Sequence, residues 1–241
     1  MARKRRKPAP LSKDEHVALR GSSPFRMLAD ETFEAVIADA EIVEAPAGTV
    51  LYDRGEDVGA LHWIARGGVL VLRVRDRDER TALELVEHVR LVGEVEALLG
   101  RPAAARAEAI GDVRLVGFPV TGLARLFAED VDFAMALLGS AASHIPARIY
   151  RIVAINHLTD VERVARWLCE RAGKPAGSTE FVLPFEKRAV AESLLMAPES
   201  FSRALSRLNA VGVRVDRNKL RIADLGRLAV IAGIADESES P

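Results

Sequence analysis

The sequence predicts an α+β chain in which an N-terminal β-roll is followed by a long helix and by a C-terminal helical unit with a β-hairpin. Three observations predict this order. Short apolar runs separated by Gly, Pro and Asp turns fill the chain from Pro24 to about Val120, which is typical of an all-β region. Apolar residues then recur every three or four residues, the period of a helix. Near the C-terminus, a basic turn separates two short strands. The expected boundaries are 1–20 for a disordered basic tail, 21–125 for the roll, 126–158 for the long helix and 159–241 for the C-terminal unit.

The composition limits the classes of protein that the chain can represent. Its 241 residues include 34 basic and 35 acidic side chains, so the chain as a whole carries almost no net charge. Attraction to a polyanion such as DNA would therefore have to come from a local cluster of basic residues. Cys169 is the single cysteine, which excludes an intramolecular disulfide and argues against an all-cysteine iron–sulfur cluster. The apolar runs are too short to span a bilayer, and the basic N-terminus lacks the apolar core of a secretory signal. We therefore expect a cytoplasmic protein without membrane contact.

Candidate strands of the roll follow one another at short and nearly regular intervals. They cover Glu41–Glu44, Val50–Tyr52, Leu61–Ala65 and Val69–Val74, with a turn predicted at Arg66-Gly67-Gly68. Repeated short strands with Gly and Asp turns favour a sandwich, roll or barrel.

The long helix carries a pattern of the kind found along a coiled-coil seam. Apolar residues spaced alternately by four and three positions, with a polar residue at the end, are Leu138, Ala142, Ile145, Ile149, Ile152 and Asn156. This spacing favours a helix that pairs with a second copy, and the alternative is a helix packed on its own domain. Pro146 should kink or break the helix, because it removes a backbone donor.

Two helical segments with a very short connection follow a helix over 160–172 and a short strand at Phe181–Leu183. They cover Lys187–Leu195 and Pro198–Asn209. Pro198 suits the first position of a helix, where a missing N–H costs nothing. The second segment has an apolar face formed by Phe201, Ala204, Leu205 and Leu208.

The opposite face of the second segment is polar, and its side chains match the edges of DNA bases. It comprises Glu199, Ser202, Arg203, Ser206 and Arg207. Arginine can donate two bonds to guanine, and glutamate can accept one from cytosine, whereas serine and an outer arginine suit phosphates. An ordinary solvated face is the alternative. The next segment decides between them, because 211–222 reads as a hairpin with the basic tip Asp216-Arg217-Asn218. Two helices and such a hairpin make a winged helix-turn-helix, a fold that binds double-stranded DNA.

At this point the sequence resembles the Crp/Fnr family of transcription regulators. The stretch KRAVAESLLMAPESFSRALSRL resembles the family's helix-turn-helix in its Fnr-like variant, and VERVARWL resembles the helix that leads into it. GEVEALLGRP resembles the effector loop of a cyclic-nucleotide-binding-like jelly roll. The resemblance implies a homodimer on two-fold palindromes, with RNA polymerase as a further partner. The implied DNA-binding residues are Lys187, Glu199, Ser200, Ser202, Arg203 and Arg207. This sequence departs from the family pattern in the turn, where Leu195-Met196 replaces the usual glycine and Ala197 a Ser or Thr cap.

The same resemblance marks Gly93, Glu94 and Arg101 as candidate effector-binding residues. Members that bind cyclic AMP hold its phosphate with an Arg-Ser pair, where this chain has alanines over 103–105. Alanine offers an anion neither charge nor hydroxyl. Cyclic AMP is therefore not the expected ligand, and the effector stays unidentified.

Two other sensor or enzyme chemistries stay open as alternatives. Haem would use as axial ligands some of His16, His62, His88 and His144. A cupin-like enzyme would need clustered His and carboxylate ligands, whereas the roll holds only His62 and His88 and has no His-x-His pair. A third alternative is a regulator that needs no ligand and responds through its abundance. The main hypothesis is a DNA-binding regulator that is not an enzyme and holds no structural metal.

Overall fold

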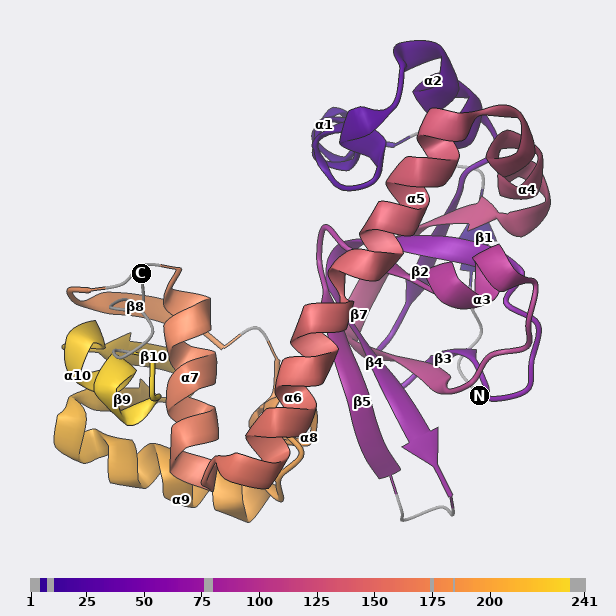
Figure 1. Ribbon diagram of the computed structural model, residues 1–241. Coiled ribbons are helices and arrows are strands. Elements are labelled where there is room, and N and C mark those ends of the chain that lie inside the picture. The colour runs from indigo at the N-terminus through magenta and orange to yellow at the C-terminus, as the bar shows by residue number, and fades with distance from the viewer. Residues whose placement is uncertain (1–4, 8–10, 76–79, 174–175, 184, 235–241) are drawn as a thin grey trace. The chain divides into compact units, whose positions relative to one another are not determined.

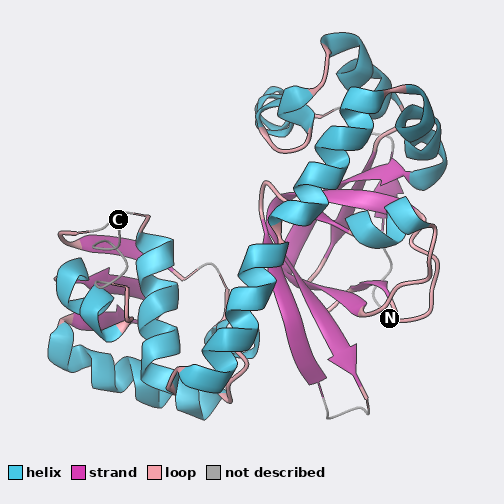
Figure 2. Ribbon diagram, viewed as in Figure 1, coloured by secondary structure: helices cyan, strands magenta, loops and turns pink. Residues whose placement is uncertain are grey.

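The structure, a computed structural model, describes residues 5–7, 11–75, 80–173, 176–183 and 185–234. The chain divides into two compact units, one that ends at Pro146 and one that begins at Ala147. Figure 1 labels their helices and strands, and Figure 2 shows the distribution of the two kinds of element.

The N-terminal unit is a β-roll with helices before, within and after it, which confirms the predicted fold class. Its elements are β1 (Arg5–Lys7), α1 (Lys13–Gly21), the 3-10 turn η1 (Phe25–Met27), α2 (Asp30–Ala38), β2 (Glu41–Ala45), β3 (Val50–Tyr52), β4 (Ala60–Val74), β5 (Arg80–Glu87), β6 (Leu91–Val92), α3 (Glu94–Leu99), β7 (Arg106–Pro119), α4 (Val120–Glu129), α5 (Val131–Ser143) and the start of α6 (Ile145–His157). The strands pair antiparallel in the order β1-β2-β7-β4-β5, with β3 on β7 and β6 on β4.

The two faces of the roll's strands line two different cores. Trp63 of β4 lies in a core shared with helices α1, α2, α4 and α5, which gather at one end of the roll (Figure 1). Its neighbour Ile64 points the other way, into the interior of the roll. This alternation is the period-2 pattern of a strand. Through it, β4 contributes both to the core inside the roll and to the core shared with the helices.

The strand β4 runs through the glycine pair that the sequence predicted to be a turn. Gly67 has a φ of +84°, and the register between β4 and β7 shifts on both sides of the preceding residue, Arg66. A Cβ atom at Gly67 would lie 2.8 Å from the carbonyl oxygen of Asp112. The predicted turn is therefore wrong: the glycines form a bulge within one continuous strand, and Gly67 permits the close approach of β7.

The expected disorder over 1–20 is also wrong for the part of this segment that the structure describes. β1 pairs with β2, and α1 begins with a capping box in which Ser12 and Glu15 bond each other's backbone N–H groups. Leu19 of α1 is fully buried. Arg114 contacts the Glu15 carboxylate and lowers its pKa to about 2. The rest of the basic cluster, Arg3 and Lys4, lies outside the described residues.

Three helices, α4, α5 and α6, occupy the region 120–157. α5 ends at Ser143 and α6 begins at Ile145, so the break lies at His144. Pro146 is the second residue of α6, where a proline removes no intrahelical hydrogen bond. The proline thus begins a helix here.

The C-terminal unit consists of the rest of α6 followed by helices and a small sheet. Its elements are α7 (Asp160–Ala172), β8 (Thr179–Val182), α8 (Lys187–Ser193), α9 (Pro198–Leu208), the 3-10 turn η2 (Asn209–Val211), β9 (Val213–Asp216), β10 (Lys219–Ile222) and α10 (Leu225–Ile231). The sheet order is β8-β10-β9, and all pairs are antiparallel. A single core joins α7, α8, α9, α10 and this sheet. The predicted winged helix-turn-helix is therefore confirmed. Within the described ranges, no helix has the length and apolar character needed to cross a membrane.

Replacing Gly67 with alanine should destabilise the N-terminal unit. The positive φ and the contact with the Asp112 carbonyl together should lower the free energy of unfolding by about 2 kcal/mol or more. Urea denaturation followed by circular dichroism measures this change. Gly59→Ala is the matched control, because nothing lies within 4 Å of a Cβ atom at Gly59. Equal effects of the two substitutions would contradict the bulge.

Candidate nucleic-acid interface

Helix α9 has one buried and one exposed side, as its sequence predicts. Phe201, Ala204, Leu205 and Leu208 are buried in the core of the C-terminal unit. Pro198 occupies the start of the helix, and Ala197 supplies no side-chain cap. Since the four buried residues lie on one face, the side chains on the opposite face of α9 are exposed.

The exposed side of α9 brings together most of the predicted DNA-binding residues. Glu199, Ser202, Arg203 and Arg207 are exposed, and Ser200 is half-buried. Arg203 donates from Nη2 to the hydroxyl oxygen of Ser200 at 2.9 Å. Lys187, the remaining predicted residue, is exposed at the first position of α8.

The turn between α8 and α9 contains no glycine. Leu195 adopts the left-handed conformation, with a φ of +54°. This conformation costs an L-residue about 1–2 kcal/mol. The turn therefore needs an external support.

Arg163 of α7 provides that support. Its Nη1 donates to the carbonyl oxygens of Leu194 at 3.1 Å and of Leu195 at 3.4 Å. Its Nη2 pairs with Asp160 at 2.5 Å. Bonds from a charged donor to carbonyls that end a helix are favourable, so Arg163 stabilises both the end of α8 and the strained turn. Sequence reasoning missed this residue, because the two carbonyl groups that it binds in the turn lie more than thirty positions away.

The wing presents basic side chains on its two strands and at its turn. Arg214 of β9, Arg217 of the turn and Lys219 of β10 are all exposed. Arg214 donates from Nη1 to the carbonyl oxygen of Asn209 at 2.9 Å, which ties the wing to the segment that follows α9.

The candidate effector residues do not converge in the same way. Gly93 is the N-cap residue immediately before α3, with a φ of +90°, and lies close to Val58 and Tyr52. Glu94 is 7% exposed and accepts a hydrogen bond from Ser140 of α5, whereas Arg101 is exposed beyond the end of α3.

Charge near these residues does not suit an anion. Arg106 donates to both carboxylate oxygens of Asp53, at 3.2 and 2.5 Å, and this ion pair lowers the pKa of Asp53. Burial raises the pKa of the Tyr52 hydroxyl, and the nearby carboxylates of Glu96 and Glu84 raise it further. Ala103 and Ala105 are buried and apolar. In this part of the roll, Arg106 is therefore already paired and carboxylates lie near Tyr52, an environment that does not favour a bound anion.

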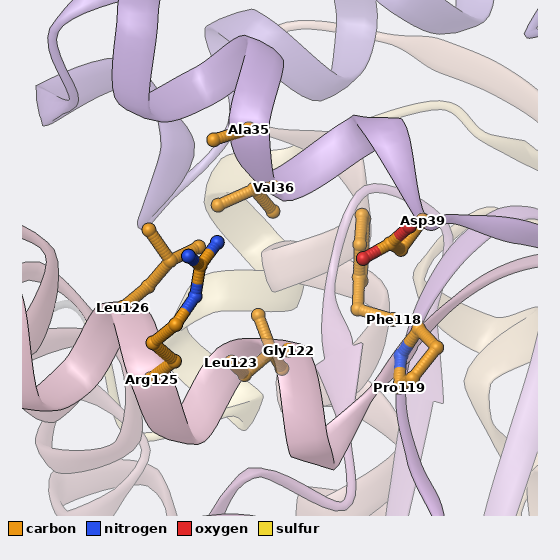
Figure 3. A pocket seen from close by; sticks show the side chains of 9 residues that line it. All are labelled: Ala35, Val36, Asp39, Phe118, Pro119, Gly122, Leu123, Arg125 and Leu126. Atoms are coloured by element: carbon orange, nitrogen blue, oxygen red, sulfur yellow. The ribbon is translucent and has the colours of Figure 1, made fainter.

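The roll unit also has a small pocket between α2 and α4, on the helical side (Figure 3). Its apolar lining includes Val36, Phe118 and Leu126, and its polar side chains are Asp39 and Arg125. The cavity measures about 20 Å³, which is room for about one water molecule. It is far too small for a nucleotide or a haem.

The histidines considered for haem lie on separate elements. His16 on α1 faces Glu34 at 3.6 Å, and His144 at the end of α5 faces Glu94 at 3.4 Å. His62 is buried in β4, and His88 is exposed after β5. Within the described ranges, no group of three or more His, Cys, Asp or Glu side chains is placed to hold a metal ion.

The residues of the predicted seam are exposed. Those on α5 lie on one side of that helix, and those on α6 lie on one side of α6. Leu138 of α5 is 47% exposed, and Ile152 of α6 is 62% exposed. The other seam residues, all exposed, are Ala142, Ile145, Ile149 and Asn156. Val131 and Met135 extend the α5 part by further exposed apolar side chains, at 74% and 63%. Their spacing of four and three residues before Leu138 is the signal that could have found them.

Comparisons with known proteins agree with this architecture. A cyclic nucleotide-binding domain model matches residues 42–130, and a Crp-like helix-turn-helix domain model matches residues 162–231. No curated protein matches the chain.

Solved structures of similar proteins match both units. One, from Ruegeria pomeroyi and provisionally named a cyclic nucleotide binding protein, is 28% identical with a TM-score of 0.64, and the match covers 90% of this chain and 96% of that one. Another, from Silicibacter pomeroyi and provisionally named a cAMP-binding regulatory protein, is 27% identical with a TM-score of 0.65, over 92% and 99%. FixK2 from Bradyrhizobium japonicum shares the fold, with 22% identity and a TM-score of 0.72 over 80% and 96%.

The roll, the winged helix-turn-helix and the exposed face of α9 define a DNA-binding transcription regulator. With the two domain matches in this order, the chain belongs to the Crp/Fnr family. Members of this family are regulators and not enzymes, so the cupin-like alternative is wrong.

Replacing Leu195 with glycine should stabilise the C-terminal unit. Glycine adopts a positive φ without steric cost, so we expect the free energy of unfolding to rise by about 1 kcal/mol. Thermal and urea denaturation measure the change. Leu194→Gly is the matched control and should destabilise, because Leu194 has a φ of −90° and packs against the core. A loss of stability in both variants would contradict the strained turn.

Proposed function

We propose that this regulator binds two-fold palindromic DNA as a homodimer, with one α9 in the major groove of each half-site. The observation that carries this proposal is the exposed side of α9, with Glu199 and Arg203 in its first half. In helix-turn-helix proteins, the N-terminal part of the second helix contacts base edges, and the half-sites lie about 34–36 Å apart.

Each exposed side chain of α9 has a role that its chemistry suits. Arg203 donates to O6 and N7 of a guanine, and Glu199 accepts from N4 of a cytosine. Phosphate contacts that fix the position of the helix come from Ser202, Arg207 and Lys187. At the wing, Arg217 and Lys219 contact the backbone in the same way.

Ser200 supports the reading role of Arg203. Its hydroxyl accepts from the guanidinium one helical turn away at 2.9 Å. This bond limits the rotamers of an exposed arginine before DNA arrives, so less conformational entropy is lost on binding.

The homodimer is supported by the exposed apolar side chains on α5 and α6. A two-fold axis places the same patch of each subunit against its copy, which suits a self-complementary apolar stripe. A polar residue at one seam position, here Asn156, specifies register in such helix pairs. Asn156 donates to the carbonyl oxygen of Ile152 at 2.8 Å.

A signal acts at the roll in this proposal, and the signal is not cyclic AMP. The buried alanines at 103 and 105 and the pairing of Arg106 with Asp53 support that exclusion. RNA polymerase is the further partner that regulation of transcription requires.

Selection from random duplex DNA by the full-length protein tests the reading roles. We expect an enriched two-fold palindrome. Arg203→Ala should cost about 1–3 kcal/mol and relax the preference at one base per half-site. Lys187→Ala should weaken binding to all sequences about equally and lower its salt dependence. If Arg203→Ala also weakened binding uniformly, the reading role would be wrong.

A charge in the seam should separate the subunits. Ile152→Asp places a carboxylate in an apolar interface, so we expect monomers in sedimentation equilibrium and loss of high-affinity palindrome binding. Val17→Asp is the matched control, because Val17 is 71% exposed on α1 and outside the seam. A dimer that survives Ile152→Asp would argue for another interface.

A further inference from the structure

The carboxylate of Glu94 is bound by α5 of its own chain. Its Oε1 accepts from the Ser140 hydroxyl at 2.8 Å, and its Oε2 lies 3.4 Å from Nε2 of His144. Glu94 and Ser140 are 7% and 6% exposed. Glu94, the first residue of α3, is therefore held against the end of α5 by Ser140 and His144. We call this set of contacts the tie.

Arg90 completes the group from a third direction. Its Nη2 contacts Nδ1 of His144 and pairs with Glu84 of β5 at 3.0 Å. Arginine only donates, so in this contact Nδ1 of His144 is the acceptor. His144 thus lies between Arg90 on its Nδ1 side and Glu94 on its Nε2 side, and Ser140 donates to the same carboxylate.

The backbone that presents Arg90 is strained and firmly held. Val89 has a φ of +65°, which is an outlier for a β-branched residue. Its N–H donates to the carbonyl oxygen of Ile64 at 2.8 Å, and the N–H of Ile64 donates to the carbonyl oxygen of Arg90 at 2.9 Å. Strain of this kind persists where the surroundings fix it, and it is concentrated at functional positions.

The tie acts on the helix that carries the first part of the seam. Ser140 lies on the inner side of α5, where Phe133 and Leu137 are also buried, and His144 is the residue that caps the end of this helix. Val131, Met135 and Leu138 are exposed on the same helix. Fixing the inner side of α5 to α3 therefore fixes which residues α5 offers to a second copy.

We propose that Ser140 and His144 act as an internal ligand of the roll. They supply Glu94 with the donors that a small molecule would otherwise bring, and they hold α5 in place. The chain then takes its DNA-binding form without an added effector, and a signal that competes for Glu94 releases α5. This inference rests on the proposed function for its consequence at DNA, but the tie itself can be measured without DNA.

Hydrogen exchange of the full-length protein, followed by mass spectrometry, tests the tie. Ser140→Ala and His144→Leu should each speed exchange at least tenfold in peptides of α3 and the second half of α5, with α7 unchanged. His144→Gln, which keeps a neutral donor and acceptor, should restore most of the protection. Ser143→Ala is the matched control, because its hydroxyl donates to the carbonyl oxygen of Ser140 and lies outside the group. Wild-type exchange of α5 in both Ser140→Ala and His144→Leu would overturn the proposal.

Binding to the selected palindrome, measured with protein stripped of small molecules by unfolding and refolding, tests the consequence. We expect tight binding by the wild type and at least tenfold weaker binding by Ser140→Ala and His144→Leu, with His144→Gln close to wild type. Binding that appears only after cell extract is added would overturn the internal-ligand role. Failure of the wild type to select any sequence, with or without extract, would instead count against the proposed function and leave the exchange result standing.

Discussion

The burial of one side of α9 determines what the C-terminal unit can offer to DNA. Phe201 is fully buried and Leu208 nearly so, and a buried side chain of this size contributes about 1.5–3 kcal/mol. Phe201 also meets the ring of Trp167 on α7 edge to face, with centroids 6.5 Å apart. Any rotation of α9 that hid Arg203 would expose this apolar side. The same packing therefore holds the unit together and directs the polar residues outward.

The charged groups on the exposed side of α9 differ from several that hold the roll together. In the roll, Arg106 bonds Asp53, Arg114 bonds Glu44, and Glu94 is bound by α5, so these charges are satisfied within the chain. On α9, Glu199 and Arg207 are exposed. Charged groups that are paired internally hold a fold in one arrangement, whereas exposed donors and acceptors on a rigid helix are available for recognition. This contrast supports the proposed recognition of DNA by α9.

The features predictable from the sequence are those encoded by local periodicity. The apolar face of α9, the hairpin from Val213 to Ile222 and the strands around Val50 all follow from spacing and turn residues. Features that depend on distant partners were not predictable. The strained conformation of Leu195 is supported by Arg163, which donates to its carbonyl oxygen, and the buried Glu94 accepts a hydrogen bond from Ser140, 46 positions along the chain. The glycine bulge in β4 follows from the neighbouring strand, not from the glycines alone. The capping box at Ser12 is a local signal for the start of α1. The basic residues that precede it favoured a disordered tail instead, so the helix was not predicted.

The positions of the two tryptophans give the protein a built-in optical probe in each unit. Trp63 lies in the core of the roll, where its Nε1 donates to the Ser22 hydroxyl at 3.1 Å. Trp167 lies on α7 against Phe201, with the Arg171 guanidinium 5.3 Å from its ring centre. The sequence contains two tryptophans, so replacing either one leaves a fluorophore that reports on a single unit. Emission from Trp63 then follows the integrity of the roll, and emission from Trp167 follows the packing of α9 against α7, without any attached dye.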